Sequence, residues 1–254
     1  RQAYVHSTRR TAGERGHQPQ TTQFALLCQI RLSMILPLAG IPPHLGASTM
    51  TLDFPHLVAQ ITHLHRDTVA RWHECDPDNP YEGLLGVICQ QHQFNFLLWH
   101  EEDVARSPDV GDARIAQVKR AIDRYNQQRN DWIERIDETI INELAAAAVC
   151  PSQDARLNTE TPGSAIDRLS IMSLRIFHLR EQLDRPEIDA EQRTKVQARL
   201  ERCDLQLADL SNSLAELLTD LFAGKKMLKV YRQMKMYNDP TMNPYLYKSQ
   251  RLAG

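Results

Sequence analysis

Apolar residues recur at helical spacing along most of the chain beyond residue 52. In the segment 52–74, Leu57, Ile61 and Leu64 fall on one side of a helix because they stand three or four positions apart. Four further segments show the same pattern, at about 81–106, 112–147, 162–184 and 189–223, separated by "CDPDNP", "SPDVGD", "CPS" and "DRPEID". The pattern predicts an all-α protein, a bundle of five long helices.

The last of these segments carries a stripe of leucines, which we expect to lie in the core rather than at a partner interface. They are Leu200, Leu207, Leu210, Leu214, Leu217 and Leu221. Gly224 marks the end of this helix. Beyond it we expect a short basic helix over 225–237, followed by a loop because Pro240 and Pro244 bias the residues before them away from helix.

The first 49 residues differ from the rest in charge and in pattern. Five arginines and one acidic residue give them a net charge of +4, whereas the whole chain carries −2. We interpret 1–49 as a disordered leader or as upstream sequence that is not native, with Met50 as the natural start. Residues 50–254 are expected to form a single helical domain.

Polar residues on the segment 81–106 share a face with core residues instead of lying on the solvent side. At 100° per residue, His92, Asn95, Trp99, Asp103 and Arg106 fall in one sector with Ile88, while His100 and Glu102 flank it. Polar groups turned inward must find partners, because unpaired burial costs about 1–3 kcal/mol per group.

The segment 112–147 carries a second polar stripe, with Arg129 at its edge. Its members are Lys119, Asp123, Asn126, Asn130, Glu134 and Asp137. We expect the two stripes to face each other, either as a buried network that fixes helix register or as a polar pocket between helices, where bundles place ligand sites.

Evidence for a metal site in these stripes is weak. His100 and Asp103, like Glu134 and Asp137, have the i, i+3 spacing that places two ligands on one helix face. Residues 50–254 contain no Glu-x-x-His, which dinuclear carboxylate bundles use twice. A divalent metal therefore stays an open expectation, and the cofactor is unknown.

Two further regions offer candidate side chains. Asp167 and His178 share a face of the fourth helix but stand about 16 Å apart along it, so they cannot serve one reacting atom together. In the tail, Lys229 and Arg232 belong to a basic face that would suit a phosphate, an anionic sugar or an acidic partner, or would simply be solvated.

Composition excludes several classes of function. A net charge of −2 argues against bulk binding to nucleic acid, and no stretch reaches the roughly 18 apolar residues of a membrane span. The five cysteines form no CxxC pair, so we expect a reducing cytoplasm rather than a disulfide framework. Phosphate-binding glycine loops and the Gly-x-Ser-x-Gly elbow are also missing from the sequence.

Four blocks of the chain resemble a known family. "NPYEGLLGVICQQHQFNFLLWHEEDVARSPDVGD", "VKRAIDRYNQQRNDWIERID", "LNTETPGSAIDRLSIMSLRIFHLREQ" and "KVYRQMKMYNDPTMNPYLY" are similar, in this order, to the bacterial domain-of-unknown-function family 4254, over about residues 50–247. The resemblance implies an all-α, cytoplasmic bacterial protein and supplies no reaction. It also implies an association with glycosyltransferases of cell-surface polysaccharide assembly.

Two hypotheses follow, and the sequence leaves open whether the protein is an enzyme. In the first, an inter-helix pocket binds or transforms a polar molecule that contains phosphate or sugar. The candidate catalytic residues are His92, His100, Glu102, Asp103 and Glu134. The candidate ligand-binding residues are Asn95, Trp99, Arg106, Asn126, Arg129, Asn130, Asp137, Lys229 and Arg232. In the second, the protein is a non-catalytic partner of a glycosyltransferase.

Overall fold

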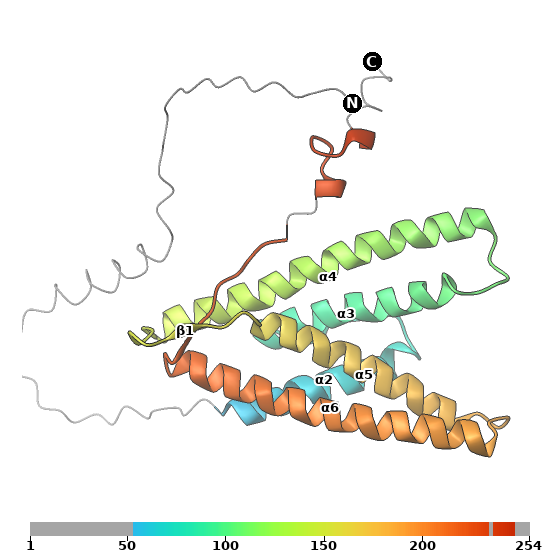
Figure 1. The fold of residues 1–254 in the computed structure, drawn as a ribbon, viewed down its shortest axis with the longest axis horizontal. Helices are drawn as coiled ribbons and strands as arrows, with labels where there is room; N and C mark the ends of the chain where they lie inside the picture. The colour runs from blue at the N-terminus through green and yellow to red at the C-terminus, as the bar shows by residue number, and fades with distance from the viewer. Residues whose placement is uncertain (1–52, 234–235, 247–254) are drawn as a thin grey trace, which may run out of the picture. The chain divides into compact units, whose positions relative to one another are not determined.

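Five long α-helices account for most of the described chain, as the apolar periodicity predicts (Figure 1). A computed structural model describes residues 53–233 and 236–246. The helices are α2 (Phe54–Trp72), α3 (Gly83–Val104), α4 (Asp112–Ala146), α5 (Pro162–Asp184) and α6 (Ala190–Phe222). The all-α bundle is therefore confirmed, while the expectation for 1–49 concerns residues outside those described.

The helices pair as two hairpins, α3 with α4 and α5 with α6, and α2 packs against α5 and α6 (Figure 1). The main core cluster lies where these elements meet and includes Ile61, Ile88, Ile136, Leu169 and Leu214. The leucine stripe of α6 faces inward as expected, because Leu200, Leu214, Leu217 and Leu221 are buried and Leu207 and Leu210 are partly buried. Apolar burial of this extent supplies most of the stability of such a bundle.

Side chains cap the starts of three helices. Asp53, Thr161 and Asp189 accept hydrogen bonds from the backbone N–H groups of His56, Ser164 and Gln192, at 3.0, 3.1 and 2.7 Å. Each bond satisfies an N–H that the helix itself leaves without an acceptor. None of the described helices combines the length and apolarity that a membrane crossing requires.

The expected basic helix at 225–237 is wrong. Lys226–Met227 forms a short strand, β2, that pairs in parallel with β1 (Arg156–Leu157), and the described residues after it include a single 3-10 turn, η1, at Met236–Asn238. Gly224 sets up this path with a φ of +70°, and a Cβ there would lie 2.6 Å from the carbonyl oxygen of Cys150. The chain leaving α6 therefore runs beside the α4–α5 connector, and its backbone hydrogen bonds go to that connector instead of to a helix.

Candidate functional site

A buried hydrogen-bonded network joins α3 to α5. The Asp167 carboxylate on α5 accepts hydrogen bonds from Gln91 (2.6 Å) and Asn95 (2.9 Å), and Asn95 also donates to Ser170 Oγ (2.8 Å). Ser170 in turn lies 2.6 Å from His92 Nδ1, while the other ring nitrogen of His92 donates to the backbone oxygen of His65 at 3.2 Å. The inward polar face of α3 thus meets α5 and α2, and not the polar stripe of α4 as expected.

Arg129 is the α4 residue that reaches this network. Its Nε lies 4.0 Å from Asp167 Oδ1, and both side chains are largely buried. Burial raises the pKa of Asp167, and the Arg129 guanidinium, with the amides of Asn95 and Gln91, acts in the opposite direction. Paired amides and an ion pair of this kind fix the register of neighbouring helices, which is the structural alternative expected for the inward polar residues.

Two histidines are buried beside the network as neutral imidazoles. Desolvation lowers the pKa of His92 to about 3 and lowers the pKa of His65 well below 6.5. The ring of His92 stacks on Trp72 at 5.2 Å and lies 4.5 Å from that of His65. A proton carrier near neutral pH needs a pKa near 7, so burial makes His92 unsuited to that role.

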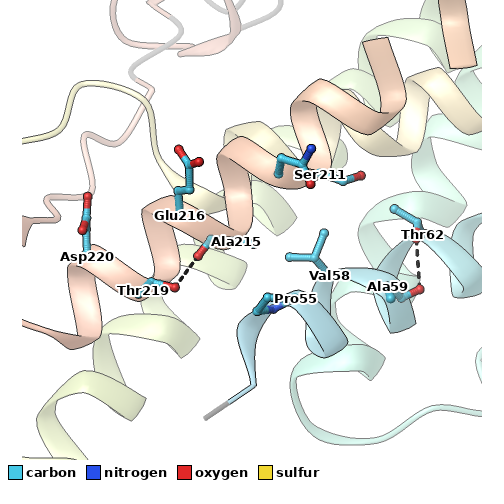
Figure 2. A pocket seen from close by; sticks show the side chains of 10 residues that line it. Pro55, Val58, Ala59, Thr62, Ser211, Ala215, Glu216, Thr219 and Asp220 are labelled. Atoms are coloured by element: carbon cyan, nitrogen blue, oxygen red, sulfur yellow. Dashed lines mark hydrogen bonds between the residues drawn. The ribbon is translucent and has the colours of Figure 1, made fainter. Parts of the chain in front are cut away.

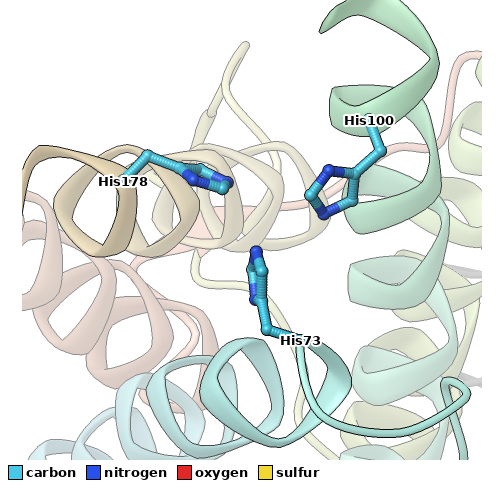
Figure 3. Close-up of side chains that lie close together, drawn as sticks. All are labelled: His73, His100 and His178. Atoms are coloured by element: carbon cyan, nitrogen blue, oxygen red, sulfur yellow. The ribbon is translucent and has the colours of Figure 1, made fainter. Parts of the chain in front are cut away.

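Three other histidines converge from three helices (Figure 3). His73 stands at the C-terminal end of α2, His100 lies on α3 and His178 lies on α5. One ring nitrogen from each can be chosen so that all three lie within 4.8 Å of one another. We call His73, His100 and His178 the three-histidine cluster.

Hydrogen bonds fix which nitrogen two of these rings present. His73 Nδ1 lies 2.7 Å from the backbone oxygen of Val69, an acceptor, so Nδ1 carries the proton. His178 Nδ1 lies 2.6 Å from Glu181 Oε2, and its Nε2 is buried with no hydrogen-bond partner. In both rings Nδ1 is thus held by a carbonyl or carboxylate oxygen and Nε2 is the remaining nitrogen, which is the arrangement found when a histidine binds a metal.

Aromatic rings enclose the cluster. Trp99 stacks on His178 (centroids 5.0 Å apart, planes 10° apart), Phe177 stacks on His73 (4.2 Å) and Phe96 meets the edge of His100 (4.5 Å). Burial, followed by the neighbouring His73 and His178, lowers the pKa of His100. His100 is therefore neutral at pH 7, the protonation state that a metal ligand requires.

Three imidazoles are a donor set for Zn²⁺ and related ions. Zn–N bonds of about 2.0–2.1 Å in a tetrahedral site place nitrogens roughly 3.3 Å apart. The nitrogens of the cluster must close by about 1.5 Å at most from their present separation of up to 4.8 Å. His73 is the exposed member of the cluster, whereas His100 and His178 are half-buried.

The structure separates the remaining candidates of α3. His92 and Asn95 belong to the buried network, whereas Trp99 and His100 belong to the three-histidine cluster. Asp103 and Arg106 are exposed, contrary to the inward face expected for them. Arg106 forms a 2.6 Å ion pair with Glu102 one turn away, a surface pair of the kind that contributes little to stability.

The candidate residues of α4 and of the tail form contacts with different parts of the chain. Asp137 accepts a 2.7 Å hydrogen bond from the Gly163 N–H at the start of α5. Glu134 accepts one from the Gln233 N–H (2.9 Å), and Arg232 pairs with Glu138 at 2.8 Å. Asn130 is buried, Asn126 is half-buried and Lys229 is exposed. The four α4 residues are spread along that helix and do not gather at one point with His92 or His100.

A shallow hollow of about 730 Å³ lies between α2 and α6 (Figure 2). Its lining includes Pro55, Val58, Ala59, Ser211 and Ala215. The Thr62 and Thr219 hydroxyls there donate to carbonyl oxygens of their own helices (3.0 and 2.7 Å), so they are engaged already (Figure 2). The hollow gathers none of the candidate residues.

Fold and site together define an all-α bundle in which three histidines converge at the point where α2, α3 and α5 meet. The model of the family described as protein of unknown function (DUF4254) matches residues 86–230, more than half of the chain, and the protein belongs to this family. No curated protein matches the chain. No solved structure matches it either.

Sequence reasoning found two of the three clustered histidines and missed the third. His100 and His178 stood out on helical faces, but His73 lies two residues before the "CDPDNP" breaker and belongs to no polar stripe. Its position at the end of α2 indicates a shared site only when the packing of α2 against α3 and α5 is known. Periodicity within one helix cannot supply that information.

Proposed function

We propose that the protein binds a divalent transition-metal ion, of which Zn²⁺ is the reference case, through His73, His100 and His178. The observation that supports this is the convergence of three imidazoles, two of which have their Nδ1–H groups held by Val69 and Glu181. The burial of His178 Nε2 without a partner adds to it, since a buried unsatisfied nitrogen costs free energy that a metal bond would recover.

We propose that the ligand of the first hypothesis binds at this metal. A bound cation supplies a Lewis acid for a polar molecule that contains phosphate or sugar, and Trp99 beside His178 supplies an aromatic surface. The earlier expectation of a pocket between α3 and α4 is replaced, because His92 and Asn95 are committed to contacts with α5 and α2. A cytoplasmic, bacterial setting is part of the proposal, and the buried free thiols of Cys89 and Cys203 are compatible with a reducing compartment.

The test is metal binding by the full chain. The purified protein is stripped with a chelator, and Zn²⁺ is titrated in competition with a chromophoric chelator. We expect one tight ion per chain, with affinity at least 100-fold weaker in His100→Ala and His178→Ala. His56→Ala is the matched control, because His56 is exposed and outside the cluster.

Two further measurements distinguish a loss of metal binding from a loss of folding. Melting curves of the metal-free variants show whether they fold, and the wild-type melting temperature is expected to rise with Zn²⁺ because only the folded chain holds the three ligands together. Equal affinity in the wild type and in folded His100→Ala would refute the proposal.

An exposed aromatic tail favours the second hypothesis, in which the protein docks onto a glycosyltransferase-type partner. Tyr231, Tyr237 and Tyr245 are 68%, 62% and 88% exposed, and Lys229 and Arg232 lie beside the first of them. Aromatic and arginine side chains are enriched at protein interfaces. Tyr231→Ser with Tyr245→Ser should weaken the binding of a purified partner without changing Zn²⁺ affinity, and unchanged partner binding would reject this role for the tail.

A further inference from the structure

We infer that the metal site is open on one side and that its fourth position accepts a small oxyanion, a carboxylate or a phosphate group. This inference rests on the proposed function, because it needs a bound metal ion. It goes further by naming the chemical class of the ligand that the ion would hold.

The number of protein donors leaves one position unfilled. Among the His, Cys, Asp and Glu side chains in the described part of the chain, the group that includes this cluster consists of three histidines and no fourth member. Structural zinc sites have four protein ligands, whereas sites that exchange ligands have three and leave the fourth position to water or substrate. The three-histidine cluster has the second composition.

Solvent reaches the cluster from the side of His73. His73 is exposed, whereas His100 and His178 are half-buried. Phe96, Trp99 and Phe177 pack against the rings of His100, His178 and His73 respectively. We therefore expect an incoming ligand to enter from the solvent beside His73, next to aromatic rings. Low polarity around an ion strengthens the attraction between that ion and an anion.

The charge of the donor set determines which ligand is preferred. Three neutral imidazoles leave both positive charges of the ion uncompensated, so an anionic oxygen is favoured at the open position. The charged or titratable groups in electrostatic range of His100 are His73 at the end of α2, Asp103 on α3, and His178 and Glu181 on α5. Glu181 already accepts the hydrogen bond of His178 Nδ1. It therefore orients the His178 ring as a metal ligand instead of bonding to the ion itself.

Asp103 is the rival for the fourth position. It lies one turn beyond His100 on α3 and is exposed, so its carboxylate has room to move. A site closed by Asp103 would carry four protein ligands and would not exchange with external anions. The experiment must therefore distinguish an open site from one that Asp103 closes.

The full chain is loaded with Co²⁺, whose visible absorption bands report coordination number, and is titrated at constant pH and ionic strength. Acetate and inorganic phosphate are the two probes, and perchlorate is the weakly ligating control. We expect saturable spectral changes at millimolar acetate or phosphate, none with perchlorate, and the same cobalt content after desalting. The tighter of the two probes identifies a carboxylate- or a phosphate-bearing ligand.

A cobalt spectrum that neither anion changes would overturn the inference while leaving metal binding intact. If Asp103→Asn then restored the response, Asp103 would be the fourth ligand. Failure of the chain to develop cobalt bands at all would overturn the proposed function and this inference with it.

Discussion

Asp137 on α4 accepts a 2.7 Å hydrogen bond from the backbone N–H of Gly163 in the first turn of α5. The first N–H groups of a helix have no acceptor within that helix, so this carboxylate caps α5 from a neighbouring element. The contact is close because a glycine stands at 163: an added Cβ would lie 2.5 Å from the backbone oxygen of Ile133. Helices α4 and α5 are thus fixed to each other at this point.

Gly163→Ala is expected to destabilise the protein by roughly 1–3 kcal/mol, because α4 and α5 must separate to admit the methyl group. Gly111→Ala is the matched control, since an added Cβ at Gly111 meets no atom within 4 Å. Urea denaturation of both variants measures the difference. A Gly163→Ala protein as stable as the Gly111→Ala protein would contradict the close approach of the two helices.

Asp137→Asn is expected to stabilise the protein at pH 8. Burial raises the pKa of Asp137 from 3.8 to about 6, so the folded chain binds this proton more tightly than the unfolded chain does. Stability from this group therefore increases as pH falls through 6 toward 3.8, and the charged form costs up to about 3 kcal/mol at pH 8.

The higher unfolding free energy of Asp137→Asn relative to wild type should appear in urea titrations at pH 8 and become smaller by pH 4. Asp137→Ala separates the two roles, because it removes the acceptor for Gly163 as well as the charge and should lower stability at both pH values. An asparagine variant that is less stable than wild type at pH 8 would show that the carboxylate charge is stabilising.

His92 is expected to make the protein less stable in mild acid. Its pKa is about 3 in the folded chain and near 6.5 when unfolded, so the unfolded chain binds the extra proton and stability is lost as pH falls below 6.5. The loss amounts to about 2 kcal/mol between pH 8 and pH 5. His65 and His100, whose pKa values are also lowered, act in the same direction, and Asp137 acts in the opposite one.

His92→Gln isolates this effect. The variant should be less stable at pH 8, because a buried contact with Ser170 is disturbed, but it should lose less stability between pH 8 and pH 5 than the wild type does. Unfolding free energies at several pH values give the two slopes. Identical slopes would mean that His92 does not carry the acid sensitivity.

Glu181→Gln is expected to weaken Zn²⁺ binding by 10- to 100-fold, because Glu181 orients the His178 ring through Nδ1 and raises its basicity. Glu191→Gln serves as the control, since Glu191 is exposed and pairs with Lys195 on its own helix, α6. Chelator competition measures both affinities. Unchanged Zn²⁺ affinity in Glu181→Gln would show that His178 is not held as a metal ligand in this way.

The fold followed from periodicity because the helices bury apolar residues that recur at helical spacing. Thr161 and Pro162 mark the start of α5 where it begins, and the leucines of α6 face the core. The segment after Gly224 was misread because Met227, Val230 and Met234 have helical spacing, whereas the backbone of Lys226 and Met227 pairs with a distant segment. Local pattern carries no information about such a partner.

The candidate site was only partly predictable, for a related reason. A helical wheel gives the direction of a side chain but not the element it meets, so it turned Asn95 and His92 inward correctly and assigned them to the wrong neighbouring helix. It also placed Asp103 inward, although the end of α3 is exposed there. His73, His100 and His178 become neighbours only through the packing of three helices.

The short pairing of β1 with β2 has a practical consequence for shortening the chain. Asn158 donates its N–H to the Met227 oxygen at 3.0 Å, and Ser152 donates to the Gly224 oxygen at 2.9 Å. A truncation at Gly224 would leave the α4–α5 connector beside an empty edge, with Asn158 deprived of its acceptor. Deletions meant to probe the aromatic tail should therefore begin after Leu228, so that the pairing of β1 with β2 is kept.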